Sequence, residues 1–205
     1  MIKKGRLRDI RRTDLKIFKV EKMKQIKKPK KKPLPLPVPV QAPAEKSIQL
    51  VNAAKDGDLD KVKDLIAEGV DVDSKNKGGT TALMMAARFD NLDIVEYLVE
   101  KGADVNAKNE LGRGALYMAA RNGHVDVVEF LLDNDADINA KDSKYGNTVL
   151  MGACTRGQLE VVKILVKNEN LRINAKNKSK HTALYLAEER GYDDIVKILK
   201  KNGAK

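Results

Sequence analysis

Apolar residues recur at a fixed period over residues 47–205. The small-residue pair of each period, or its equivalent, stands at Ala53-Ala54, Ala86-Ala87, Ala119-Ala120, Ala153-Cys154 and Ala187-Glu188. The steps between these pairs are 33, 33, 34 and 34 residues. Valine at positions 62, 95, 128, 162 and 196, and leucine at positions 65, 98, 131, 165 and 199, keep the same register. This self-similarity predicts stacked units that bury their apolar faces against one another.

The second period shows what one unit contains. Thr81 precedes a short apolar run over 82–87, which predicts a helix capped by the threonine hydroxyl. Apolar residues then recur with helical spacing over 92–99, which predicts a second, amphipathic helix. Gly102 follows, in a position suited to the left-handed conformation that ends a helix. The pattern therefore predicts helix, turn, helix and an extended tip.

Several motifs in this register resemble the ankyrin repeat: Gly146-Asn147-Thr148-Val149-Leu150, Ala119-Ala120-Arg121-Asn122-Gly123-His124, the segment 127–132 and the segment 102–107. The resemblance implies an all-α fold, an α-solenoid of helix pairs with hairpin tips projecting from one side. Its five units cover about 47–75, 76–108, 109–141, 142–176 and 177–205. The family's Thr-Pro-Leu-His is replaced by Thr-Ala-Leu-Met and related sequences. The repeat sequences are similar to those of bacterial ankyrin proteins.

Charge divides the chain near residue 46. Residues 1–46 contain 16 basic and four acidic residues, a net charge of +12, whereas residues 47–205 are close to neutral. Residues 1–28 are predicted to form a basic tail that is disordered or weakly helical. All six prolines lie between Pro29 and Pro43, so 29–46 is predicted to be an extended, Lys/Pro-rich linker.

No catalytic constellation is found in the sequence. Cys154 occupies an alanine position of the repeat and is predicted to be a small buried apolar residue. His124 stands at the start of a second helix, where the resemblance implies a structural role. The two histidines lie in different units without a cysteine cluster, so we expect no metal site and no cofactor. No apolar run approaches the roughly 18 residues of a membrane span. We therefore expect a protein that is not an enzyme.

The resemblance implies that partners bind at the tips and at the inner faces of the first helices. Carried over unit by unit, the candidate positions are Lys77, Thr80, Arg88, Phe89, Glu110, Leu111, Arg113, Arg121, Asn122, Lys144, Tyr145, Asn147, Arg156, Lys178 and His181. Each tip ends in a lysine (75, 108, 141 and 176), which predicts a cationic concave face with the acids mainly on the second-helix side. The alternative is that these lysines belong to the common sequence of the repeat and have no binding role. Phe89, Leu111 and Tyr145 are the stronger anchor candidates, because aromatic residues beside arginine dominate binding energy.

Two functions remain open at this stage. The first is a protein–protein interaction module, an adaptor or scaffold, whose partner is acidic or of mixed charge. The alternative is a tail that binds nucleic acid or anionic membrane without sequence specificity, while the array presents a protein partner. Its candidate residues are Lys27, Lys28, Lys30, Lys31 and Lys32. We expect a cytoplasmic monomer, with a nuclear or host-cell location as the alternative if the tail acts as an import signal.

Overall fold

The computed structural model describes residues 43–205, which form one compact unit. The basic tail, most of the predicted linker and its five candidate lysines lie outside the described residues. Helix α2 covers Pro43–Asp56, so residues 43–46, assigned to the linker from the sequence, belong to the first helix. Proline suits the first position of a helix, because an N–H at that position has no acceptor within the helix and its absence costs nothing. Glu45 lies in the first turn, where its negative charge is favourable at the positive end of the helix dipole.

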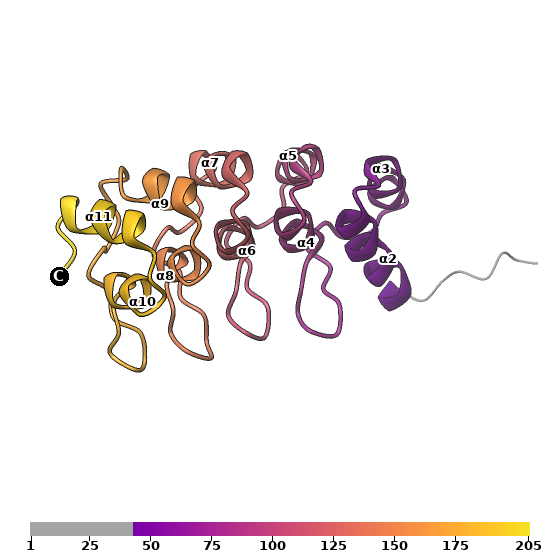
Figure 1. Cartoon of the computed structure of the whole chain (residues 1–205). Helices are drawn as coiled ribbons and strands as arrows, with labels where there is room; N and C mark the ends of the chain where they lie inside the picture. Colours follow the sequence, from indigo (N-terminus) through magenta and orange to yellow (C-terminus); the bar gives the residue numbers. More distant parts are fainter. Residues whose placement is uncertain (1–42) are drawn as a thin grey trace, which may run out of the picture. The chain divides into compact units, whose positions relative to one another are not determined.

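Ten helices stack in two rows in this part of the chain (Figure 1). The first helices of the five pairs are α2, α4 (Ala82–Arg88), α6 (Ala115–Asn122), α8 (Val149–Cys154) and α10 (Ala183–Glu189). The second helices are α3 (Leu59–Ala67), α5 (Leu92–Glu100), α7 (Val125–Asp133), α9 (Leu159–Leu165) and α11 (Asp193–Lys201). Loops project from the first-helix row (Figure 1), and residues 43–205 contain no strand beyond one isolated bridge between Lys141 and Thr148. The predicted all-α solenoid is confirmed.

Threonine side chains start three of the first helices. Thr81, Thr148 and Thr182 are the N-caps of α4, α8 and α10, and each hydroxyl accepts a hydrogen bond from the third backbone N–H of its helix at 3.3 Å. The cap predicted at Thr81 is therefore present. A cap of this kind satisfies one of the four N–H groups that a helix start leaves unpaired.

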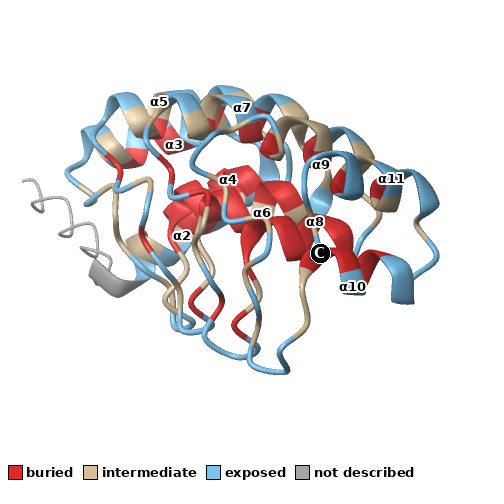
Figure 2. Cartoon of the chain, turned by 90° about the vertical axis from the view of Figure 1, so that its left-hand side faces the viewer, coloured by how far each residue is buried: buried red, intermediate tan, exposed pale blue. Residues whose placement is uncertain are grey.

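The core lies where the two rows meet (Figure 2). The small-residue pairs at 86–87, 119–120 and 153–154 are fully buried, which lets the first helices of neighbouring units approach closely. Val95, Val128 and Val162 are equally buried on the second helices. The period read from the sequence is therefore the period of the core.

Side chains at the starts of three second helices join their units to the preceding ones. The N-cap residues of α5, α7 and α9 each reach back to a backbone carbonyl at the end of the preceding unit's first helix: Asn91 Nδ2 to Ala54 O at 2.8 Å, His124 Nε2 to Arg88 O at 2.8 Å and Gln158 Nε2 to Arg121 O at 3.3 Å. Carbonyls at helix ends have no partner within the helix, so these bonds satisfy them. The structural role expected of His124 is this contact.

Candidate binding surface

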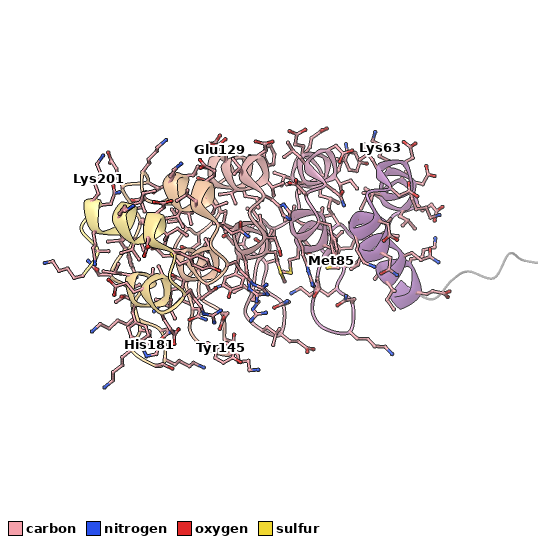
Figure 3. All side chains as sticks on the ribbon, viewed as in Figure 1. Lys63, Met85, Glu129, Tyr145, His181 and Lys201 are labelled. Carbon is pink, nitrogen blue, oxygen red and sulfur yellow. The ribbon has the colours of Figure 1, made fainter. Side chains whose placement is uncertain are left out.

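Arginines stand at equivalent places along the first-helix row. Arg88 ends α4, Arg121 lies in the last turn of α6, and Arg156 follows the C-cap of α8. Arg190 is the C-cap residue of α10, and Arg113 comes from the tip before α6. We call these five residues the arginine groove. Met85 and Tyr145 lie on this side of the molecule, with nitrogen-bearing side chains between them, whereas Lys63, Glu129 and Lys201 lie on the second-helix side (Figure 3).

Two adjoining hollows follow the arginine groove. The first, of about 500 Å³, lies between the second and third units and includes Arg88 and Glu110 in its lining. The second, of about 550 Å³, continues toward the fifth unit and includes Tyr145 and Arg190. Both are lined by the same four side chains, Arg113, Tyr117, Arg121 and Arg156. These four residues therefore form the centre of the surface.

A buried carboxylate lies beneath this centre. Asp142 is only 3% exposed, and its Oδ2 accepts a hydrogen bond from the Tyr117 hydroxyl at 3.3 Å. The same Oδ2 lies 3.9 Å from Arg113 Nη2, and the Arg113 guanidinium stands 5.3 Å from the centre of the Tyr117 ring. Burial, followed by the charge of Asp142, raises the pKa of Tyr117 above its ordinary value, so the phenol remains a neutral donor.

Asp142 replaces an asparagine of the repeat. Asn76, Asn109 and Asn177 each accept two backbone N–H bonds through Oδ1 and thereby fix their tip loops. Asp142 Oδ1 also accepts two backbone bonds, from Tyr145 N at 2.6 Å and Gly146 N at 3.1 Å, which lie three and four residues ahead instead of two and four. Asp142 was not among the residues predicted from the sequence. The sequence feature that could have indicated it is the replacement of asparagine by aspartate in one tip of four.

The arginine groove has little compensating negative charge. Arg113–Asp142 is its one ion pair among the described residues, since no carboxylate lies within 4 Å of the other four guanidinium groups. Burial lowers the pKa of Arg121, and the positive charges of Arg156, Arg113 and Arg88 lower it further. Arginine still stays charged at neutral pH, so these groups repel one another across the hollows.

The hollows bring together ten of the fifteen partner-binding candidates, namely Thr80, Arg88, Glu110, Leu111, Arg113, Arg121, Asn122, Tyr145, Asn147 and Arg156. Lys77, Phe89, Lys144, Lys178 and His181 line neither hollow. Met85, Tyr117, Met118 and Tyr192 also line the hollows and were not predicted from the sequence. The first three lie in first helices, at positions where side-chain size varies between units, whereas Tyr192 is the N-cap residue of α11.

The cations that line the hollows are arginines, four of which were candidates from the sequence, and not the lysines that end the tips. The lysines that end the tips, at positions 75, 108, 141 and 176, are exposed but contribute to neither hollow. The three anchor candidates Phe89, Leu111 and Tyr145 are exposed by 42%, 44% and 49%. Tyr185 is exposed to a similar extent and stacks on His181, with 4.0 Å between the ring centres. Aromatic surface therefore flanks the arginine groove.

Cys154 is fully buried on α8, and burial raises the pKa of its thiol from 9.0 to about 12. A thiol that stays protonated in an apolar site is a weak nucleophile. Its place in the first-helix row is taken by Ala54, Ala87 and Ala120 in other units. The residue packs as the sequence analysis expected.

The buried thiol predicts a loss of stability in alkali. Between about pH 9 and about pH 12 the unfolded thiol is ionised while the folded one remains protonated. The unfolded state then binds fewer protons, so this residue lowers the free energy of unfolding by up to about 1.4 kcal/mol per pH unit. We expect Cys154→Ala to flatten the pH dependence in urea unfolding from pH 8 to 11. Parallel curves for the two proteins would show that the thiol is not responsible.

Within residues 43–205, no helix is long and apolar enough to cross a bilayer, and no three His, Cys, Asp or Glu side chains gather as metal ligands would. No curated protein matches the chain. Two segments, residues 50–142 and 141–205, match the family model described as ankyrin repeats (3 copies).

Proposed function

Because the chain belongs to the ankyrin repeat family, we propose that it is a non-catalytic adaptor or scaffold that binds a protein partner through the arginine groove and the adjacent tips. Arrays of this family are generally protein–protein interaction modules. The observation that carries the proposal is that exposed Leu111 and Tyr145 line the hollows together with the arginines, while the ring centre of exposed Phe89 lies 5.4 Å from the Arg88 guanidinium. Such aromatic and arginine pairs are the residues that dominate binding energy at interfaces.

We further propose that the partner presents negative charge. Of the five guanidinium groups of the arginine groove, only that of Arg113 has an ion-pair partner among the described residues, and Glu110 is the one carboxylate that lines either hollow. An acidic surface therefore has electrostatic complementarity with the groove. Complementarity of this kind accelerates association and selects against basic partners more than it sets the final affinity. The exposed tip lysines extend the same positive charge beyond the hollows.

We expect the double variant Phe89→Ala/Tyr145→Ala to abolish partner capture. Both rings are half exposed, so their loss removes contact surface without opening the core, and truncation of an anchor residue typically weakens binding by about 2 kcal/mol or more. The measurement is quantitative pull-down from native cell extract with the full chain, together with the thermal midpoint. The midpoint should stay unchanged.

The matched control is Glu96→Ala/Lys197→Ala, which removes two exposed side chains from the second-helix side. It should retain capture at the level of the unmodified chain. Undiminished capture by the Phe89/Tyr145 variant would exclude this face as the interface.

A further inference from the structure

Three arginines converge where the two hollows meet. Arg113, Arg121 and Arg156 line both hollows, and burial, together with the charges of Arg156 and Arg113, lowers the pKa of Arg121. The surrounding space is open to solvent and amounts to about 500 Å³ on one side and 550 Å³ on the other. Mutual repulsion of three fixed cations is relieved when an anion enters such a space.

Asp142 does not serve as the anion that the three arginines lack. Its Oδ1 accepts two backbone N–H bonds, and its Oδ2 accepts the Tyr117 hydroxyl. Arg113 approaches that oxygen only to 3.9 Å, which is beyond hydrogen-bond distance. Arg113 Nε is buried and has no hydrogen-bond partner, an uncommon state for a charged donor. The carboxylate of Asp142 therefore lies beside Arg113 but leaves its Nε without an acceptor.

We propose that the centre of the arginine groove binds a phosphorylated side chain on an extended segment of the protein partner, with Arg113, Arg121 and Arg156 around the phosphoryl oxygens. This inference rests on the proposed function, since it names the chemistry that the same surface recognises.

The number of donors favours phosphate over carboxylate. A carboxylate carries one charge and two oxygens, and one arginine satisfies it through a bidentate pair. A phosphorylated side chain carries about −1.5 to −2 charges at pH 7 and three acceptor oxygens. Three converging guanidinium groups match the second description, since only that of Arg113 lies near a carboxylate and that carboxylate is already hydrogen-bonded elsewhere.

The lining of the first hollow favours a peptide over a nucleic acid. Met85, Met118 and Leu111 supply apolar surface beside the arginines, which suits the side chains that flank a phosphorylated residue. Glu110 lines the same hollow. A continuous polyanion would meet this carboxylate as a like charge, whereas a peptide with a single phosphate need not.

The experiment measures fluorescence anisotropy of labelled 11-residue peptide libraries on the full chain. One library carries a central phosphothreonine and the other an unmodified threonine, with all other positions degenerate. We expect the phosphorylated library to bind at least tenfold more tightly. Inorganic phosphate and a 12-nucleotide single-stranded RNA should compete only weakly.

Arg156→Ala and Arg121→Lys test the named side chains. Arg156 is exposed, so its removal leaves the fold intact, and lysine at 121 keeps the charge but loses the planar fork. Each should weaken binding of the phosphorylated library at least about tenfold. The control Arg172→Ala removes an exposed arginine that lines neither hollow and should leave binding unchanged.

Asp142→Asn provides a variant that acts in the opposite direction. Asparagine fixes the corresponding loop at Asn109, so the tip should keep its structure while the competing negative charge disappears. We expect binding of the phosphorylated library to tighten about three- to tenfold.

Equal binding of the two libraries would overturn the phosphate inference and leave the protein-binding proposal standing. Tighter arginine-dependent binding of inorganic phosphate or of RNA would overturn the assignment to a protein segment. The proposed function itself fails on a different result, retained partner capture by the Phe89/Tyr145 variant.

Discussion

Gly112→Ala is expected to lower the free energy of unfolding by about 2–5 kcal/mol, which combines backbone strain with steric overlap. Gly112 has a φ of +69°, a conformation that alanine adopts only at a cost of about 1–2 kcal/mol. An added Cβ would lie 2.5 Å from the backbone nitrogen of Ser143 in the next tip. That nitrogen donates to Leu111 O at 2.8 Å, so it cannot move away without losing a bond between units.

Gly102→Ala separates the two contributions. Gly102 has a φ of +86°, and a Cβ there would meet nothing within 4 Å. We expect a loss of only about 1–2 kcal/mol from the backbone conformation. Urea unfolding followed by circular dichroism measures both variants. Equal losses for the two would show that the third and fourth tips are not in close contact.

Asp142→Ala is expected to cost about 3–5 kcal/mol of stability, because it removes one partner of a buried ion pair and leaves polar groups unsatisfied. The backbone N–H of Tyr145 and the Tyr117 hydroxyl lose their acceptor together, whereas the N–H of Gly146 keeps its bond to the backbone carbonyl of residue 142. Arg113, whose side chain is only 19% exposed, also loses its nearest carboxylate.

Asp142→Asn distinguishes loop support from charge pairing. Its amide oxygen should accept the same two backbone bonds, as Asn109 does in the preceding tip. Because the Arg113–Asp142 contact is long, at 3.9 Å, we expect a loss of about 1 kcal/mol or less in urea unfolding. A loss as large as that of Asp142→Ala would mean that the ion pair, and not the loop, supplies the stability.

Most of the repeat architecture could be predicted from the sequence because it depends on contacts that recur at one spacing. The alanine pairs, the Thr81 cap and the glycines that follow α3, α5 and α11 each act within one unit or between similar neighbours. The start of α2 at Pro43 was not predicted, since a proline-rich composition favours an extended chain and masks a proline that begins a helix.

The centre of the candidate site could be predicted only in part. Arg113, Arg121 and Arg156 were named as separate candidates, but their convergence with Tyr117 depends on how the third and fourth units pack. Asp142 lies 25 residues from Tyr117 in a tip lengthened by one residue, so no local pattern connects the two. The tip lysines had the more regular spacing, yet none of them lines either hollow, and the lining comes from the helix ends and from other tip residues.

The bonds from the second-helix caps also affect how the surface responds to flexing. His124 holds the backbone carbonyl of Arg88, and Gln158 holds that of Arg121. The distance between the guanidinium groups of successive units therefore changes with the curvature of the helix stack. A ligand that bridges them stiffens the array, and any force that bends the array shifts the affinity in return.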